Sequence, residues 1–393
     1  IVSLINSKNI KKYLSKGVVT PDHVIRTKPK PIIINIDKCK TLKDINNKIH
    51  KEISLYKLEY VKYFNKYNNS KKSFKILDSI PQIIIIQNMG IFSVGRNFNE
   101  AIINGDISEM SIKTILRIEE RSKFKSIQDK DIFDVEYWSL EQAKLNKVEK
   151  SLASKVILIT GGAGAIGIAT AKKFKENGAE VILIDKNKSA LKTLVKKSHF
   201  KYYVCDVTNR KQFNKVAADI CTNYGGIDIV VSNAGSAFQS AIGDISDDNL
   251  KNSFNINFFS HQIVASECVK IMKNQGLPSC LLFNVSKQAV NPGKNFGSYG
   301  TSKAALLALC KQYALEYGHY GIRSNGVNAD RIKSGLLTSE MIKKRAKSRN
   351  VTKEDYIKSN LLNKEVFPSD VAEAFYHLAI SEKTTAAIFT VDG

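Results

Sequence analysis

The sequence predicts an α/β fold in which a doubly wound parallel sheet follows a smaller N-terminal α/β segment. Two observations support this prediction. From about residue 152, short runs of apolar and β-branched residues alternate with stretches of helical length. A glycine-rich run stands between the first of these strands and the helix that follows it. Such alternation of strand and helix produces parallel strands whose two faces are covered by helices.

The larger part of the chain, which we take as residues 148–393, contains the alternating pattern. Its apolar runs have the length of strands and are rich in Val, Ile and Leu, as strands buried on both faces are. The predicted strands are Val156–Ile159, Val181–Asp185, Tyr202–Val204, Ile227–Ser232, Leu281–Val285 and Ile388–Val391. Predicted helices between them include Ile166–Asn177 and Gln212–Tyr224.

Residues 1–147 have a less regular pattern. Glycine and proline interrupt residues 1–35, so we expect no long element at the beginning of this segment. Asp131–Lys147 is predicted to be a polar and aromatic connector to the second domain. The elements predicted between these parts are strands at Ile32–Ile36, Pro81–Gln87 and Ile91–Val94, and helices at Thr41–Tyr67 and Asn97–Ser122.

Composition limits the classes of function. The net charge of +23 would suit a nucleic-acid-binding protein, but the excess of Lys and Arg is spread over the whole chain, which favours a solvated basic surface. No apolar run approaches the ~20 residues needed to cross a bilayer. The six cysteines form no C-x-x-C pair, which argues against a zinc or redox motif. No signal peptide is recognisable, and we expect a cytoplasmic protein.

The glycine-rich run is Thr160-Gly-Gly-Ala-Gly-Ala-Ile-Gly167. Its place between a strand and a helix is the context that the dinucleotide-binding loop of a Rossmann-type sheet requires. Glycines let the backbone approach a pyrophosphate, and the helix N-terminus supplies N–H donors. Taken alone, the run is also compatible with an ordinary turn. The candidate cofactor-binding residues here are Thr160, Gly161, Gly164, Ala165, Ile166 and Gly167.

The cofactor preference depends on Asp185, which ends the second predicted strand at the place, ~20 residues after the glycines, where an acidic residue is expected. A carboxylate there accepts hydrogen bonds from the ribose hydroxyls of NAD and repels the 2′-phosphate of NADP. The positive charge of the adjacent Lys186 weakens this preference, because a cation attracts the 2′-phosphate of NADP. We expect NAD to be favoured over NADP, although Asp185 alone could simply be a turn residue.

Tyr299 and Lys303 form the candidate catalytic pair, because their spacing puts both side chains on one face of a helix. A free tyrosine has a pKa of ~10, and a nearby ammonium favours the phenolate, so we expect a lowered pKa for Tyr299. Ser286 follows a predicted strand, and its hydroxyl is suited to bind the substrate oxygen on which charge develops. A tyrosine four residues before a lysine is common by chance, but the ordered succession after the glycine loop and Asp185 is not.

These residues resemble the short-chain dehydrogenase/reductase superfamily over roughly residues 152–393. The resemblance implies that Tyr299 is the acid/base, that Lys303 lowers its pKa and holds the nicotinamide ribose, and that Ser286 orients the substrate. It also implies a homo-oligomer, either a dimer or a tetramer. Further matches to the family are an adenine-contacting pair, Asp206 and Val207, an N-A-G motif, Asn233, Ala234 and Gly235, and an asparagine that anchors a proton-relay water, Asn257.

Between Asn328 and Ser334 the chain departs from this family, which usually has Pro-Gly followed by a threonine that binds the cofactor carboxamide. Ser334 stands at the place of that threonine and retains a hydroxyl. Asp330 and Arg331 are unusual there. We hypothesise that Arg331 contacts an anionic or polyhydroxylated substrate, since a guanidinium suits a carboxylate or phosphate. A salt bridge between Asp330 and Arg331 is an equal alternative.

The stretches Gly17–Lys28 and Phe133–Lys144 resemble bifunctional rhamnulose-1-phosphate aldolase/short-chain dehydrogenase proteins, in which a class II aldolase domain precedes the reductase. The aldolase centre needs a zinc ion held mainly by histidines, whereas residues 1–150 contain only His23 and His50. We therefore expect no metal site in this chain. We expect residues 1–147 to be the C-terminal portion of the aldolase region and a connector, with the metal-binding part upstream.

The leading interpretation is an NAD-dependent oxidoreductase that moves a hydride between nicotinamide and a small hydroxy or carbonyl compound of sugar catabolism, with lactaldehyde as a candidate. The alternative enzyme is a polyol or hydroxy-acid dehydrogenase acting on a secondary alcohol. A non-catalytic NAD-binding scaffold is a third interpretation, but a scaffold has no need of the complete tetrad. We expect a small-molecule substrate, and neither nucleic acid nor membrane as a partner. The tetrad consists of Asn257, Ser286, Tyr299 and Lys303.

Overall fold

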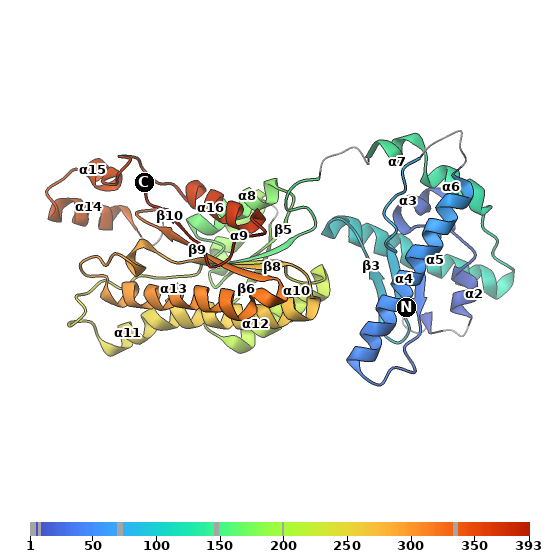
Figure 1. Ribbon diagram of the computed structural model, residues 1–393, viewed down its shortest axis with the longest axis horizontal. Helices are drawn as coiled ribbons and strands as arrows, with labels where there is room; N and C mark the ends of the chain where they lie inside the picture. Colours follow the sequence, from blue (N-terminus) through green and yellow to red (C-terminus); the bar gives the residue numbers. More distant parts are fainter. Residues whose placement is uncertain (1–4, 7–8, 69–73, 145–148, 199, 333–336) are drawn as a thin grey trace. The chain divides into compact units, whose positions relative to one another are not determined.

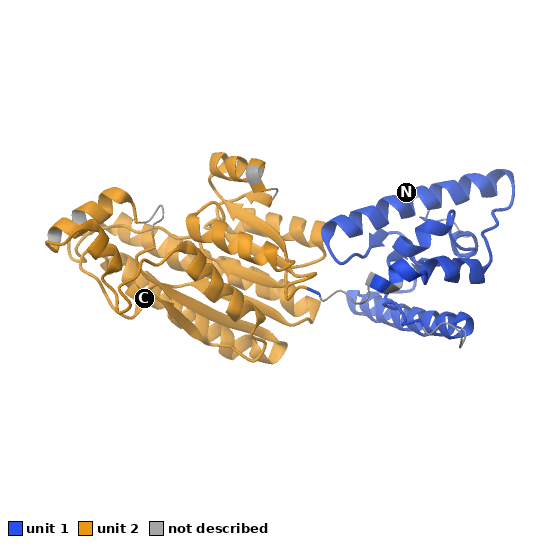
Figure 2. Cartoon of the chain, turned by 90° about the horizontal axis from the view of Figure 1, so that it is seen from above, with its two compact units in different colours: residues 1–149 blue, residues 150–393 orange. Residues whose placement is uncertain are grey.

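The structure of the chain is a computed structural model, and it describes residues 5–6, 9–68, 74–144, 149–198, 200–332 and 337–393. The chain divides into two compact units, residues 1–149 and residues 150–393, which Figure 2 colours separately. Each unit has its own sheet and its own buried clusters.

The sheet of the larger unit is parallel throughout, with the strand order β10-β9-β8-β7-β4-β5-β6. This order confirms the predicted doubly wound α/β fold. The order reverses between β4 and β7, and such a reversal opens a crevice at the carboxyl ends of the strands. The strands are β4 (Val156–Thr160), β5 (Glu180–Asp185), β6 (Lys201–Val204), β7 (Ile229–Ser232), β8 (Ser279–Asn284), β9 (Ile322–Ala329) and β10 (Ile388–Val391).

Helices cover both faces of this sheet, with α12 and α13 on one side and α8 and α16 on the other (Figure 1). Successive residues of a strand point to opposite faces, so Leu158 packs with the first group while Ile157 and Ile159 pack with the second. All three are completely buried. The helices are α8 (Ala165–Glu176), α9 (Lys188–Ser198), α10 (Arg210–Tyr224), α11 (Asp247–Phe254), η2 (Asn255–Phe259), α12 (Ser260–Gln275), η3 (Lys287–Ala289), α13 (Gly297–Tyr317), η4 (Gly318–Tyr320), α14 (Ser339–Ser348), α15 (Lys353–Lys358) and α16 (Pro368–Ile380).

The smaller unit has a three-stranded sheet in which β2 pairs in parallel with β1 and antiparallel with β3. Its strands are β1 (Ile32–Ile34), β2 (Ile83–Ile86) and β3 (Gly90–Ser93), close to the predicted positions. The two long predicted helices are also present, and Asn97 caps the second by accepting from the N–H of Glu100. The helices are α2 (Ile10–Leu14), η1 (Pro21–His23), α3 (Val24–Thr27), α4 (Leu42–Tyr67), α5 (Phe98–Arg121), α6 (Asp129–Glu136) and α7 (Ser139–Lys144).

The prediction of a mere connector at 131–147 is wrong, because this segment contributes to the core of the smaller unit. Phe133 and Tyr137 are spaced by one helical turn, and their rings stack with centroids 4.5 Å apart. Both are almost completely buried and pack against Tyr60 and Phe64 of α4. Charged residues on the outer side of α6 account for the polar composition that suggested a connector.

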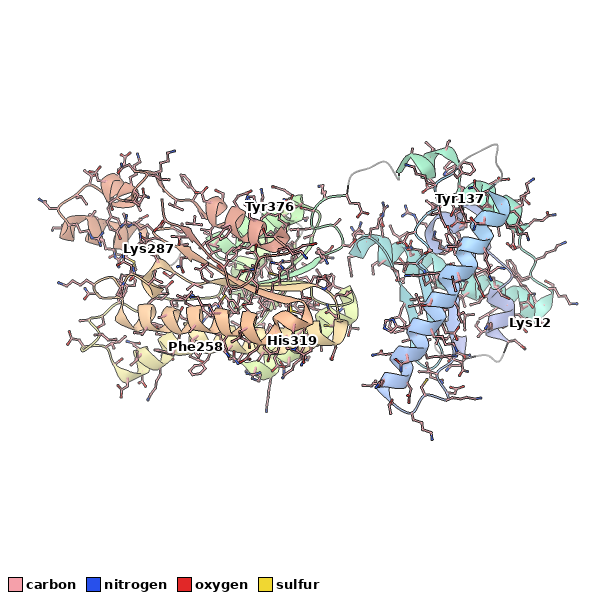
Figure 3. All side chains as sticks on the ribbon, viewed as in Figure 1. Lys12, Tyr137, Phe258, Lys287, His319 and Tyr376 are labelled. Atoms are coloured by element: carbon pink, nitrogen blue, oxygen red, sulfur yellow. The ribbon has the colours of Figure 1, made fainter. Side chains whose placement is uncertain are left out.

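A buried polar cluster joins the two stretches that carried the aldolase resemblance. Lys28 Nζ donates to Tyr60 Oη at 2.8 Å and lies 3.3 Å from Glu136 Oε1, which also accepts from Tyr60 Oη at 2.7 Å. Tyr137, labelled in Figure 3, lies with its hydroxyl 2.7 Å from that of Tyr60. The Lys28 and Glu136 side chains are only 7% and 1% exposed, so each charge depends on the other for compensation.

The buried pair leads to a stability prediction for the smaller unit. Lys28→Met leaves the Glu136 carboxylate without its cation and should lower the free energy of unfolding by about 3–5 kcal/mol. Adding Glu136→Gln, which removes the remaining charge and keeps the acceptor for Tyr60, should recover most of that loss. Urea denaturation followed by fluorescence of Trp138, the only tryptophan, measures both variants. A double variant as unstable as Lys28→Met would contradict this account.

Candidate active site

Polar residues from four strand ends meet at the carboxyl edge of the larger sheet, around the reversal between β4 and β7. Thr160, Asp185 and Asn284 are the last residues of β4, β5 and β8, and Asn233 directly follows β7. Because the strands are parallel, their carboxyl ends lie at the same edge. Two pockets open there, and together they are lined by residues of the predicted glycine loop, N-A-G motif and tetrad.

The turn after β4 depends on glycine at two positions. Gly161 has a φ of +61°, in the left-handed region that favours glycine. A Cβ at Gly167 would lie 2.4 Å from the carbonyl oxygen of Gly161, too close for any side chain. Helix α8 then begins at Ala165, and no side chain caps its first N–H groups. The backbone therefore offers a close approach and unpaired donors, which fit the pyrophosphate of a dinucleotide.

The N-A-G segment is attached to this turn by hydrogen bonds. Thr160 Oγ1 accepts from the N–H of Asn233 at 2.9 Å and from that of Ala234 at 3.2 Å. Asn233 Nδ2 donates to the carbonyl oxygens of Thr160 and Gly161 at 3.1 and 3.2 Å. Asn284 Nδ2 donates to Asn233 Oδ1 at 2.8 Å. These bonds fix the ends of β4, β7 and β8 relative to one another.

Asp185 lies on the side of the site next to β6. Its Oδ2 accepts from the N–H of Ala163 in the glycine turn at 3.1 Å, and its Oδ1 accepts from that of Asn187 at 2.9 Å. The structure brings Asp185 into one pocket with residues distant in the sequence. The other predicted cofactor residues of this pocket are Gly161, Lys186, Asp206, Val207, Ala234 and Gly235.

Tyr299 on α13 and Ser286 after β8 line the second pocket together. Ser286 Oγ accepts from the N–H of Gln288 at 3.2 Å, which holds the serine at the start of η3. Burial raises the pKa of Tyr299, its hydrogen bond with Ser286 lowers it, and the carboxylate of Asp330 raises it further. The expectation of a lowered pKa is therefore wrong for the chain by itself, because desolvation of the phenol outweighs the favourable contacts.

Lys303 lies one helical turn after Tyr299 and is 2% exposed. Its Nζ donates to the carbonyl oxygen of Asn284 at 2.8 Å and lies 5.8 Å from the centre of the Tyr299 ring. Burial lowers the pKa of Lys303 to about 7. An amine that is only partly protonated at neutral pH attracts a phenolate weakly, which explains why the expected effect on Tyr299 is missing.

Asn257 lies in η2, a π-helical turn between α11 and α12, and such turns are frequent at functional sites. Its Oδ1 accepts from the N–H of Ser236 at 3.1 Å, and its Nδ2 donates to the carbonyl oxygen of Ser236 at 2.7 Å. A Cβ at Gly235 would lie 3.1 Å from Asn257 Oδ1 and 3.7 Å from Lys303 Nζ. Asn257 thus holds the segment after the N-A-G motif beside Lys303.

Comparison with known proteins assigns both parts of the chain. Residues 161–393 match the family model described as Enoyl-(Acyl carrier protein) reductase, which is a model of short-chain dehydrogenases. The chain belongs to the short-chain dehydrogenase/reductase superfamily. Residues 1–145 match the model described as Aldolase class II, second domain. Both resemblances seen in the sequence are thereby confirmed.

Individual relatives agree with this assignment. The uncharacterized oxidoreductase YuxG of Bacillus subtilis (strain 168) is 30% identical over 411 residues, which cover 100% of this chain and 59% of YuxG. The chain therefore spans about three fifths of that relative. NAD+-bound xylitol dehydrogenase is 25% identical with a TM-score of 0.57, and ElxO with NADP bound is 25% identical with a TM-score of 0.55. Each structural match covers 61% of this chain and 97% of the other.

The segment that departs from the superfamily pattern lines the pocket in front of Tyr299. Arg331 has a φ of +53°, and its guanidinium donates to the carbonyl oxygen of Ser359 and, at 2.8 Å, to its Oγ. Its Nε lies 3.5 Å from Asp330 Oδ2, as expected from the alternative in which Asp330 and Arg331 form a salt bridge. The predicted carboxamide-binding Ser334 lies outside the described residues.

Sequence reasoning missed several residues of the site. Asn284 links Asn233 to Lys303, and its position two residues before Ser286 was an available signal. Arg345 lines the pocket in front of Tyr299 from α14, far along the chain and without a recognisable motif. His261 lies outside both pocket linings; it is completely buried, and its Nδ1 lies 2.7 Å from Ser232 Oγ.

Two other kinds of feature are absent from the residues that the structure describes. No group of three or more His, Cys, Asp or Glu side chains among them is arranged to hold a metal ion. No helix in the same parts of the chain combines the length and apolar character needed to span a bilayer.

Burial of Lys303 predicts how stability depends on pH. The pKa falls from ~10.4 in the unfolded chain to about 7 in the folded protein, so the unfolded state binds more protons between these values. This group alone should therefore raise the free energy of unfolding by about 1.4 kcal/mol per pH unit across that window. Lys303→Met should remove that contribution. Denaturation of both proteins at pH 7 and pH 9 measures the difference, and equal slopes would refute the assignment.

Proposed function

We propose that the chain is an NAD-dependent oxidoreductase that transfers a hydride between nicotinamide and a small hydroxy or carbonyl substrate of sugar catabolism. One observation supports the proposal above all: Ser286, Tyr299 and Lys303 lie beside the glycine turn, at the carboxyl edge of the larger sheet. A bound nicotinamide supplies the hydride donor or acceptor. A non-catalytic scaffold has no need of a buried lysine next to a tyrosine in an open pocket.

In this proposal the chain's own groups manage the proton and the substrate oxygen. Tyr299 Oη takes the proton of the substrate alcohol during oxidation and returns it during reduction. Ser286 holds the same oxygen and stabilises the tyrosine's phenolate through their hydrogen bond. Lys303 holds the nicotinamide ribose, and Asn257 positions Ser236 and the proton-relay water beside it.

We propose the cofactor-binding residues because the glycine turn fits the pyrophosphate of a dinucleotide. Gly161, Gly164 and Gly167 with the N-terminus of α8 hold the pyrophosphate. The carboxylate of Asp185, already oriented by two backbone N–H groups, accepts from the adenosine ribose and disfavours a 2′-phosphate. The remaining proposed contacts are Thr160, Ala165, Ile166, Lys186, Asp206, Val207, Asn233, Ala234, Gly235 and Ser334.

Two substrate candidates have separate support. The aldolase match of residues 1–145 supports an aldehyde such as lactaldehyde, because aldol cleavage releases one. The likeness to xylitol dehydrogenase and the polar side chains of Gln288, Asp330 and Arg331 support a polyol or hydroxy acid. The superfamily resemblance and the absence of C-x-x-C pairs support a cytoplasmic homo-oligomer acting on a small molecule.

The proposed role of Tyr299 is tested by activity and its pH dependence. Tyr299→Phe should reduce kcat by about 100-fold or more while NAD binding is retained. Because burial raises the pKa of Tyr299 and oxidation needs the phenolate, kcat/KM for oxidation should rise from neutral to alkaline pH, and that for reduction should fall.

Ser286→Ala should move the inflection of this profile to higher pH, because it removes the hydrogen bond that lowers the pKa of Tyr299. Initial rates with aldehydes, polyols and hydroxy acids, using NAD and NADP, provide the profiles. Full activity of Tyr299→Phe would exclude the proposed chemistry.

The proposed cofactor preference depends on Asp185. Asp185→Ser removes the carboxylate that repels a 2′-phosphate, so the ratio of kcat/KM for NAD to that for NADP should fall by about 10- to 100-fold. Lys186→Ala is the matched comparison, since loss of a cation should disfavour NADP more than NAD and move the ratio in the opposite direction. The preference is misassigned if Asp185→Ser leaves the ratio unchanged.

A further inference from the structure

Arg345 is a charged residue of the substrate pocket that the proposed chemistry does not use. It lies on α14 and lines the same pocket as Ser286 and Tyr299. Its guanidinium carbon lies 4.0 Å from the centre of the Phe296 ring. That ring is 6.2 Å from the ring of Tyr299, at an interplanar angle of 74°. The guanidinium and the Tyr299 ring are therefore both neighbours of the same aromatic ring.

Two contacts orient the guanidinium. Its carbon lies over the ring of Phe296, which is 8% exposed, and its Nη1 donates to Tyr356 Oη at 2.9 Å. Tyr356 is 1% exposed and belongs to the small apolar cluster that joins α14 to α15. The N–H groups of a guanidinium lie in its plane, where carboxylate and phosphate oxygens bind. An arginine held in this way loses little side-chain freedom on binding.

The charged groups of the pocket wall favour an anion. Among the described residues that line the pocket, the charged ones are Asp330, Arg331 and Arg345. Asp330 and Arg331 lie 3.5 Å apart and compensate each other, and Arg331 is also held by Ser359. Two of these three side chains are cationic and one is anionic, so the three together carry a net charge of +1. An anionic substrate gains attraction there, and a neutral one does not.

We propose that Arg345 binds an anionic group of a substrate whose reacting carbon lies at Tyr299 in the same pocket. This inference rests on the proposed function and chooses between its substrate candidates. It favours a hydroxy acid or a phosphorylated hydroxy compound over the neutral lactaldehyde. During oxidation the alcohol carbon gives its hydride to nicotinamide and the hydroxyl gives its proton to Tyr299, so that a carbonyl forms and the anionic group is unchanged.

Matched substrate pairs test the inference. Each pair combines an anionic compound with its neutral counterpart: hydroxy acids of increasing length with the corresponding diols, and sugar-alcohol phosphates with the free sugar alcohols. Arg345→Gln should raise KM for the anionic member by about 10- to 100-fold, the loss expected for a charge-assisted hydrogen bond. The kcat/KM for the neutral member and the affinity for NADH, measured by its fluorescence, should stay unchanged.

Arg349→Gln is the matched control. Arg349 follows α14, and its guanidinium carbon lies 5.2 Å from the Tyr356 ring, but it is not among the described residues that line the pocket. Its loss should leave every KM within about twofold, since an exposed charge contributes little. Arg345→Lys should restore part of the affinity for the anionic members, because it keeps the charge without the planar fork.

The outcomes separate the inference from the proposed function. A selective effect on the acids identifies a carboxylate subsite, and a selective effect on the phosphates identifies a phosphate subsite. Equal effects of Arg345→Gln on both members of every pair overturn the inference, while oxidation of the neutral members leaves the proposed function standing. Quenching of NADH fluorescence by each compound gives the same comparison without turnover, so that the inference is tested even where oxidation is slow.

Discussion

The buried amine of Lys303 is the group around which the site is organised. It donates to the backbone of Asn284, whose side chain holds Asn233, and Asn233 holds the glycine turn. One sequence of hydrogen bonds thus connects α13 with the ends of β8, β7 and β4. Burial keeps the pKa of Lys303 near 7, so its charge responds to whatever group binds beside it.

Burying this amine costs free energy, and the burial of apolar side chains in the sheet beneath it offsets that cost. The central strands contribute fully buried side chains to both faces, including Leu158 and Ile182 to one and Ile159 and Leu183 to the other. This apolar burial provides the favourable free energy against which a desolvated lysine can be retained. The polar groups are confined to the carboxyl edge, where the reversal of strand order leaves room for them.

The predictable parts of the site are those determined by local spacing. Tyr299 and Lys303 lie on one helix, so their four-residue spacing is enough to predict that they are neighbours. The glycine run likewise lies where the sequence predicts it, at the start of the helix that follows the first strand. The pKa of Tyr299 could not be predicted, because it depends on burial and on Asp330 from another loop. The place of Arg345 in the pocket and that of Phe133 in the core of the smaller unit could not be predicted for a related reason. Their neighbours in space come from parts of the chain that are distant in the sequence.

The departure from the superfamily pattern at Asp330 and Arg331 bears on the chemistry of the pocket. A lone carboxylate beside Tyr299 would oppose formation of the phenolate and repel an anionic substrate. Arg331 compensates that carboxylate and also reaches Ser359, so it joins the loop after β9 to the segment after α15. Arg345 and Tyr356 belong to the same α14–α15 hairpin. Arg331 therefore links the loop beside Tyr299 to the segment that follows the hairpin carrying Arg345.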